Sequence, residues 1–151
     1  MRLVLSILLL AVSQCLCQSN DEGWANPEEK ECIRSLSLEE SHIGEVVKAY
    51  APGNLPEDDD AFSKFIHCRG QQMGVQHSNG ELNIANLIQL VKYFPEGIFK
   101  ENAPEGSVLG EAIAEETIKH CKNVPVGNSA GQTLIRLQNC IDSYLVSYYK
   151  K

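Results

Sequence analysis

FSKFIHCRGQQMGVQHSNGEL, residues 62–82, is the stretch that decides the fold. Its first half predicts an amphipathic helix, because its apolar side chains recur near one face at the 3.6-residue period. These side chains are Phe62, Phe65, Ile66 and Met73. The helix ends at the turn signal HSNG, in which Asn79 and Gly80 tolerate a positive φ. Cys68 therefore lies on a helix close to a sharp turn, and its partner decides how this corner of the fold is held.

The first 17 residues, MRLVLSILLLAVSQCLC, predict a secretory signal peptide. Arg2 supplies the positive charge, residues 3–12 form the apolar run, and small residues predict cleavage after Cys17. The run is shorter than the roughly 20 apolar residues of a membrane span. We therefore expect a secreted, extracellular chain without membrane insertion, whose single domain covers residues 18–151.

The charge of the chain argues against several classes of partner. The formal net charge is −7, and an acidic secreted domain is a poor ligand for nucleic acid or for anionic membranes. We interpret the acidity as solvated helix faces, and we expect no nucleic-acid partner.

Removal of the signal peptide leaves four cysteines, Cys32, Cys68, Cys121 and Cys140. An even number in an oxidising compartment predicts two disulfides, for which three connectivities are possible. Metal binding is disfavoured, because the chain has neither a C-x-x-C nor an H-x-x-x-H spacing. We expect no metal and no cofactor.

Start signals divide the chain into helices. Asn26 precedes Pro27 and two acids, which is typical of a helix start. Residues 37–40, SLEE, fit a capping box and predict a helix through Tyr50. The acids at 57–60 favour the N-terminus of the next helix. Further helices are predicted at 83–94, 107–123 and 130–146, and no alternating strand pattern occurs. The fold class is all-α, and the very apolar helix at 83–94 is expected to be covered on most sides.

The pentapeptide Gly127–Gly131, GNSAG, matches the nucleophile elbow G-x-S-x-G. That chemistry needs a strand before Ser129 and a histidine after it. Only the short run VPV precedes the pentapeptide, and the last histidine is His120. We interpret Ser129 as a helix N-cap and expect no enzymatic activity and no catalytic residue.

Two further features leave alternatives open. The four histidines are either ordinary helix residues or a pH switch, since an imidazole titrates near neutral pH. The C-terminal LVSYYKK is either a helix end or a flap over a cavity, in which Tyr144 or Tyr148 offers a hydroxyl to a ligand.

The cysteines and the segment after Cys68 resemble those of insect odorant-binding proteins. That family has six helices and six cysteines, bridged first to third, second to fifth and fourth to sixth. Cys32, Cys68, Cys121 and Cys140 match the first, third, fourth and sixth cysteines, and the resemblance covers nearly the whole mature chain. It implies a compact six-helix fold around an apolar cavity, with the disulfides Cys32–Cys68 and Cys121–Cys140.

Two positions of this chain depart from the family pattern. The second and fifth cysteines would fall at Lys64 and Gly131, and both are absent. They are the two halves of one bridge, so the chain resembles the minus-C branch with two disulfides. We expect the lost bridge to loosen the helix at 62–73 against the last helix. A Lys64→Cys, Gly131→Cys variant is accordingly expected to form a disulfide and to raise the melting temperature.

The resemblance implies a carrier that reversibly binds small hydrophobic molecules, such as odorants, pheromones or other lipophiles, and transports them through aqueous lymph. It implies as partners a small hydrophobic ligand and, further, a membrane receptor or a second copy of the chain. The alternative is a non-olfactory body-fluid or gland protein that acts on a protein partner. Helical periodicity supplies the candidate ligand-binding residues. These are Val47, Phe65, Met73, Leu87, Ile88, Val91, Phe94, Ile113, Ile118, Leu134, Leu137, Ile141 and Tyr144.

Overall fold

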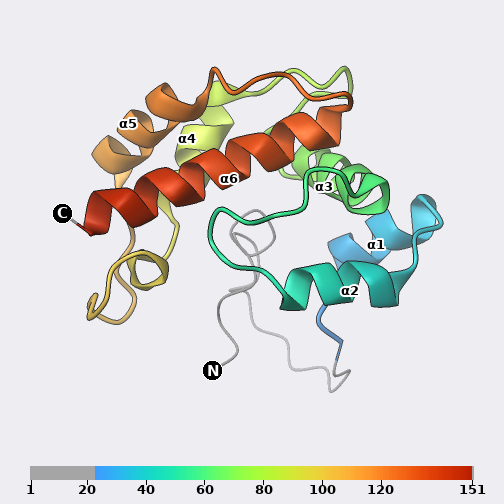
Figure 1. The fold of residues 1–151 in the computed structure, drawn as a ribbon, viewed down its shortest axis with the longest axis horizontal. Coiled ribbons are helices and arrows are strands. Elements are labelled where there is room, and N and C mark those ends of the chain that lie inside the picture. Colours follow the sequence, from blue (N-terminus) through green and yellow to red (C-terminus); the bar gives the residue numbers. More distant parts are fainter. Residues whose placement is uncertain (1–22, 151) are drawn as a thin grey trace.

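The computed structural model describes residues 23–150 as a bundle of short helices around one long helix (Figure 1). In chain order the elements are α1 (Pro27–Ser35), α2 (Glu40–Lys48), α3 (Asp60–Gln72), α4 (Ile84–Lys92), the 3₁₀ helix η1 (Glu96–Ile98), α5 (Glu111–Cys121) and α6 (Ala130–Tyr149). β-structure in the described residues is limited to the isolated bridges Gln76↔Leu82 and Pro95↔Val108. The predicted all-α, six-helix class is therefore confirmed.

Helix α6 crosses the molecule, with α4 and α5 on one side of it and α1 and α2 on the other (Figure 1). Its most extensive contact is with α3, and it also packs against α5. None of the helices in the described part of the chain is long and apolar enough to cross a membrane. The predicted signal peptide, residues 1–17, lies outside the described residues.

Four of the helices begin at the side-chain caps that the sequence predicts or allows. Asn26 and Glu29 form a complete capping box at α1, and Asp59, Asn83 and Ser129 each accept a hydrogen bond from a backbone N–H of the first turn of α3, α4 and α6. Each cap satisfies a backbone donor that the helix itself leaves without a partner. These starts therefore follow from local sequence.

The predicted capping box at residues 37–40 is wrong. Ser37 takes a left-handed φ of 52° and ends α1, because the Leu38 N–H donates to Ile33 O and the Ser37 N–H donates to Arg34 O. These two hydrogen bonds together form the pattern of a Schellman motif. Helix α2 consequently begins only at Glu40, without a side-chain cap, and it ends at Lys48 rather than Tyr50.

Helix α5 begins at Glu111, four residues later than predicted. The residues before it pair with the end of α4 and the chain just after it, since the N–H of Leu109 donates to Phe94 O and that of Gly110 to Lys92 O. Gly110 has a φ of +82°, a conformation that glycine adopts without strain. The non-local pairing outweighs the helical preference of this segment.

Helix α4 is less covered than its composition predicts. Only Leu87 and Val91 of this helix are buried, while Ile84, Ile88 and Leu90 are half-buried. The helix packs chiefly against α5, so one side of it remains open.

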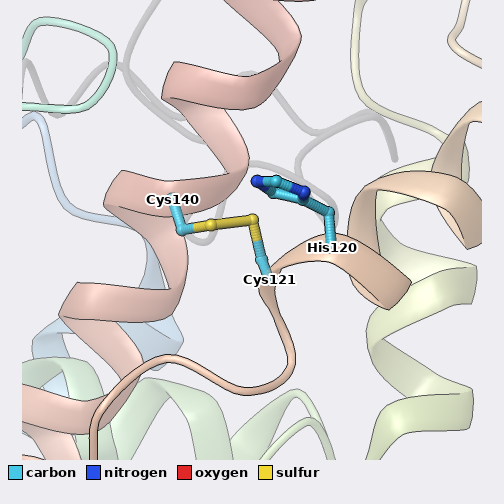
Figure 2. A group of neighbouring side chains, drawn as sticks. All are labelled: His120, Cys121 and Cys140. Atoms are coloured by element: carbon cyan, nitrogen blue, oxygen red, sulfur yellow. A yellow bond between two sulfur atoms is a disulfide. The ribbon is translucent and has the colours of Figure 1, made fainter.

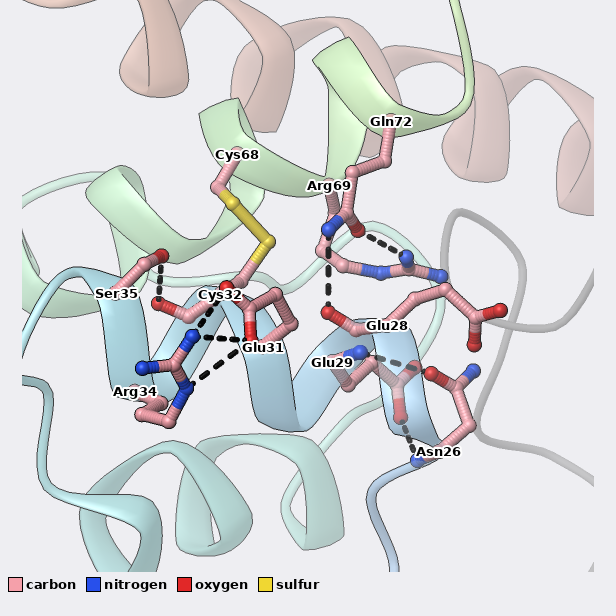
Figure 3. The surroundings of a disulfide bond; sticks show 10 residues. All are labelled: Asn26, Glu28, Glu29, Glu31, Cys32, Arg34, Ser35, Cys68, Arg69 and Gln72. Atoms are coloured by element: carbon pink, nitrogen blue, oxygen red, sulfur yellow. Dashed lines mark hydrogen bonds and ion pairs between the residues drawn. A yellow bond between two sulfur atoms is a disulfide. The ribbon is translucent and has the colours of Figure 1, made fainter.

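The two disulfides join the helix pairs that the family resemblance implies. Cys121–Cys140 links the end of α5 to α6 (Figure 2), with Cα atoms 5.7 Å apart. Cys32–Cys68 links α1 to α3 (Figure 3), with Cα atoms 5.9 Å apart. In the chain-entropy description, each disulfide raises the free energy of unfolding by roughly 3–4 kcal/mol.

Helices α3 and α6 meet backbone to backbone where the second and fifth cysteines of the family would lie. A Cβ atom on Gly131 would lie 1.8 Å from the carbonyl oxygen of Ser63, and the Ser63 and Ser129 hydroxyls are 2.7 Å apart. Lys64 lies on the exposed side of α3 and pairs with Asp60 at 2.6 Å. Close packing through a glycine, rather than a gap, occupies the place of the missing bridge.

Candidate functional site

The candidate ligand-binding residues come from five helices and from the residues that directly follow α3 and α4, and most of them join one buried apolar cluster. Buried are Val47, Phe65, Leu87, Val91, Phe94, Ile118, Leu134, Leu137 and Ile141. Half-buried at its margin are Met73, Ile88, Ile113 and Tyr144. The structure thus brings the candidates together in the core, and their contact with a ligand stays a prediction.

Tyr144 differs from the other candidates, because its hydroxyl is already engaged. It donates to Glu116 Oε1 of α5 at 2.6 Å, and this hydrogen bond raises the pKa of Tyr144 to about 12. Its ring lies 4.6 Å from that of His120 and 6.4 Å from that of Tyr148. A ligand that took a hydrogen bond from Tyr144 would have to displace Glu116.

The C-terminal segment continues α6 as a regular helix to Tyr149. The Tyr149 hydroxyl donates to Glu96 of η1 at 2.9 Å, and the hydrogen bond contributes to lowering the pKa of Glu96. The helix-end interpretation of LVSYYKK therefore describes this structure, and Tyr149 ties the end of α6 to the loop after α4.

A polar group in the middle of α6 escaped the sequence analysis. Asp142 is fully buried and accepts hydrogen bonds from the Tyr50 hydroxyl at 2.8 Å, the Gly53 N–H at 3.1 Å and Gln138 Nε2 at 2.6 Å. Burial raises the pKa of Asp142 although these bonds oppose the change, and it also raises the pKa of Tyr50. The sequence carries a sign of this buried group, because two polar residues four positions apart, Gln138 and Asp142, interrupt the apolar stripe of the last helix.

Two further buried ionisable side chains, Arg69 and Glu29, lie beside the Cys32–Cys68 disulfide (Figure 3). Arg69 is 2% exposed and Glu29 is 3% exposed. Burial lowers the pKa of Arg69 and raises that of Glu29, while the attraction between them opposes both changes. Arg69 donates to Gln72 at 2.5 Å, and Gln72 donates to the backbone of Glu28 at 3.3 Å. This cluster fastens α1 to α3.

A surface cleft of about 680 Å³ opens between the turn after α3 and the connector from α5 to α6. Polar groups line it together with apolar side chains that are half-buried or exposed, and none of the candidate ligand-binding residues does. Its apolar side chains are Leu82, Ile84, Val124, Val126 and Ala130. Because a hydrophobic ligand needs a mainly apolar enclosure, the mixed lining of the cleft is a poor match to the expected ligands.

Gln76 holds the turn beside this cleft against α6. Its Nε2 donates to Gly80 O at 3.0 Å and to Ala130 O at 2.8 Å, so both amide hydrogens are used. Its Oε1 lies 2.8 Å from Nδ1 of His67, which must therefore be the protonated ring nitrogen. A second proton on the other nitrogen of His67 would leave this bond intact.

The other histidines also show no bond that protonation would break. His42 Nε2 lies 2.7 Å from Asp59 Oδ2, and a charged imidazole would strengthen this contact. His77 and His120 are exposed. A histidine-based pH switch stays a prediction without a contact in the described residues that favours it.

The serine-nucleophile motif and the cluster of metal-ligand side chains both have structural explanations. Ser129 caps α6 by accepting from the N–H of Gln132 at 3.1 Å. His120, Cys121 and Cys140 place their ligand atoms within 4.8 Å of one another (Figure 2). The two sulfurs are bonded to each other, and a disulfide is not the thiolate that a metal needs.

Comparison with known protein families identifies a relationship over most of the chain. Residues 24–144 match the sequence profile of the PBP/GOBP family, which comprises the insect pheromone- and odorant-binding proteins. No curated protein and no solved structure matches the chain. The match spans all of the described helices except the last turn of α6.

Proposed function

The chain belongs to the PBP/GOBP family, and we propose that it carries odorants, pheromones or other lipophiles through an aqueous body fluid. The family consists of non-enzymatic binding proteins for small hydrophobic ligands. Its members are typically secreted, and the two disulfides accord with an oxidising compartment. The observation that carries the proposal is the family match over residues 24–144.

The proposed binding region is the apolar cluster between α6 and the shorter helices. Leu134, Leu137 and Ile141 of α6 supply one wall, and Leu87 and Val91 of α4 lie in the same cluster. Burial of apolar ligand surface is worth about 25 cal/mol per Å², so an odorant-sized molecule gains useful affinity without a charged group. The half-buried Met73 could adapt to ligands of different shape, because its side chain is unbranched and flexible.

Displacement of a fluorescent apolar probe tests this proposal. We expect the probe to bind with a rise in fluorescence and a panel of alcohols, aldehydes and esters to displace it. Ile88→Trp, at a half-buried proposed position, should weaken binding with little change in melting temperature. Val126→Trp is the matched control, since Val126 is 82% exposed and lies in the surface cleft.

Two outcomes would redirect the interpretation. If no member of the panel binds, a body-fluid protein that acts on a protein partner becomes the better explanation. If Val126→Trp weakens binding and Ile88→Trp does not, the ligand occupies the cleft and not the core.

Secretion is tested separately from binding. We propose that residues 1–17 are a signal peptide and that residues 18–151 are the mature domain. Expression in insect cells should release a protein into the medium whose N-terminal sequence starts at Gln18. Retention of Met1 on the secreted chain would contradict this boundary.

A further inference from the structure

Gln138 lies in the middle of the α6 face that supplies one wall of the proposed binding region. Helical spacing places it one turn from Leu134 on one side and one turn from Ile141 on the other, and both of these apolar side chains are buried. Gln138 itself is only 2% exposed. An amide is therefore set among the apolar side chains that we expect to meet a ligand.

The two ends of this amide differ in their contacts. Nε2 donates to Asp142 Oδ1 at 2.6 Å, whereas Oε1 is buried and has no hydrogen-bond partner among the described residues. A buried carbonyl oxygen without a partner is rare, because its removal from water costs free energy that only a hydrogen bond returns. The oxygen of Gln138 is therefore a hydrogen-bond acceptor that remains available in the core.

Asp142 determines which end of the amide is free. Its carboxyl accepts from the Tyr50 hydroxyl at 2.8 Å, from the Gly53 N–H at 3.1 Å and from Gln138 Nε2. An ionised carboxylate can only accept hydrogen bonds, so it holds the NH₂ group of Gln138 and turns the carbonyl oxygen away. The donors on the other side of Asp142 come from the segment between α2 and α3, so the orientation of the amide is supported by two parts of the fold.

A second buried polar atom without a partner lies elsewhere in the molecule and suits a different role. Arg69 Nε also has no hydrogen-bond partner among the described residues, but it lies where α3 meets α1, beside Glu28 and Glu29 (Figure 3). The charge of Arg69 is opposed by these carboxylates, and the cluster fastens two helices. Gln138 differs, because its free atom is neutral and belongs to the helix of the proposed binding wall.

We propose that Gln138 is a specificity-determining residue of the binding region and that the preferred ligands are lipophiles with a hydroxyl group, such as aliphatic alcohols. The ligand hydroxyl would donate to Gln138 Oε1, and the hydrocarbon part would pack on Leu134, Ile141 and the rest of the apolar cluster. The inference rests on the proposed carrier function and names a class of ligand for the same region.

The direction of the preference follows from the cost of removing polar groups from water. In a purely apolar site an alcohol binds less well than an ether of the same size, since a hydroxyl buried without a partner loses its hydrogen bonds to water. A site that already holds a free acceptor reverses this order, because the alcohol satisfies Oε1 and its own hydroxyl together. An ether or an aldehyde has no hydrogen to donate and would bring a second acceptor beside the first.

Competition between octanol and its isomer heptyl methyl ether for a bound fluorescent apolar probe tests the inference. The two molecules have the same composition, and only octanol can donate a hydrogen bond. We would measure at about pH 8, which favours the carboxylate form of Asp142. We expect octanol to bind about fivefold more tightly than the ether or better, which corresponds to one net hydrogen bond, and octanal to resemble the ether.

One substitution and a matched control assign the preference to Gln138. Gln138→Met keeps a side chain of similar length without the carbonyl oxygen, so the preference for octanol should disappear or reverse while the ether still binds. Gln89→Met makes the same chemical change at an exposed position of α4 and should keep the preference of the wild type.

The wild-type protein offers a second measurement that needs no variant. The side-chain NH₂ resonances of Gln138 in NMR spectra should shift on addition of octanol and less with the ether, because a hydrogen bond to the carbonyl oxygen polarises the whole amide. If Gln138→Met does not fold, this comparison decides the question.

Three outcomes would contradict the inference. Equal affinities, or tighter binding of the ether, would show that Oε1 receives no ligand hydroxyl, and the carrier function would stand without it. A preference that survives in Gln138→Met and disappears in Tyr144→Phe would assign hydroxyl recognition to Tyr144. If neither molecule nor any other lipophile binds, the carrier function itself fails, and the inference fails with it.

Discussion

Replacement of Gly131 by alanine would test the unusual contact between α3 and α6. A methyl group at this position would lie 1.8 Å from Ser63 O, 2.5 Å from Ser63 C and 2.6 Å from Ser63 Oγ. The first two atoms belong to the backbone of a helix, so no side-chain rotation relieves the contact. The two helices would have to move apart.

The required movement sets the size of the effect. A carbon normally approaches a carbonyl oxygen to about 3.3 Å, so the helices would have to separate by roughly 1.5 Å. This would strain the contact between the Ser63 and Ser129 hydroxyls and the bond from Gln76 to Ala130 O. Overpacking costs about 1–3 kcal/mol, and loss of a hydrogen bond costs about 1 kcal/mol. We expect a loss of about 3 kcal/mol, or about 10 °C in melting temperature.

Thermal and denaturant unfolding measure this loss. An ordinary Gly→Ala change in a helix raises stability by up to about 1 kcal/mol, so the expected sign is the reverse of the helix-propensity effect. Gly97→Ala is the control, because a Cβ atom there meets nothing within 4 Å. If Gly131→Ala is as stable as the wild type or more so, the close backbone contact is not present in solution.

The same contact reverses the expectation for restoring the lost bridge. Sequence alone predicts that Lys64→Cys with Gly131→Cys would form a disulfide and stabilise the protein. In the structure a Cβ on Gly131 has no room, and Lys64 faces solvent beside Asp60. We now expect the oxidised double variant to melt below the wild type, and a higher melting temperature would contradict this.

The remaining predictions concern the second disulfide, the cap of α6 and the buried acid. Cys121→Ser with Cys140→Ser should lower the free energy of unfolding by about 3 kcal/mol in urea titrations; an unchanged midpoint would show that the bridge is dispensable. Ser129→Ala should cost about 1 kcal/mol for the lost cap, and any esterase activity that disappears with the hydroxyl would contradict its structural role. Since burial raises the pKa of Asp142, its contribution to stability is full below the ordinary pKa and is lost as the pH rises through the folded-state value. The melting temperature should therefore fall less from about pH 4 to pH 8 in Asp142→Asn than in the wild type, and parallel profiles would refute the assignment.

Local sequence predicts the features that depend on neighbouring residues. Asn26, Asn83 and Ser129 mark helix starts because a short polar side chain reaches its own first turn. The same reasoning fails at Ser37, because this residue forms the C-terminal end of α1 and does not cap α2. It fails again at Leu109 and Gly110, whose backbone partners are Phe94 and Lys92, at and just after the end of α4. Local propensity is weak, and a few non-local hydrogen bonds outweigh it.

The candidate site divides in the same way. Periodicity identified residues that lie in the apolar core, because a helix face that repeats every 3.6 residues must be buried somewhere. It could not show that Tyr144 bonds to Glu116 on α5, or that Asp142 meets Tyr50 from across the fold. These contacts join residues 28 and 92 positions apart.

The stretch of residues 62–82, which begins within α3, shows where the division falls. The sequence by itself determined that this stretch is an amphipathic helix with a cysteine that ends at a turn, since both properties depend on short-range periodicity and turn chemistry. Its cysteine framework, through the family resemblance, also indicated the partner of Cys68. Only the tertiary structure decided how the same helix meets α6. The backbone contact of Ser63 with Gly131 depends on the separation of two helices, which is set by packing across the whole core and by no local pattern.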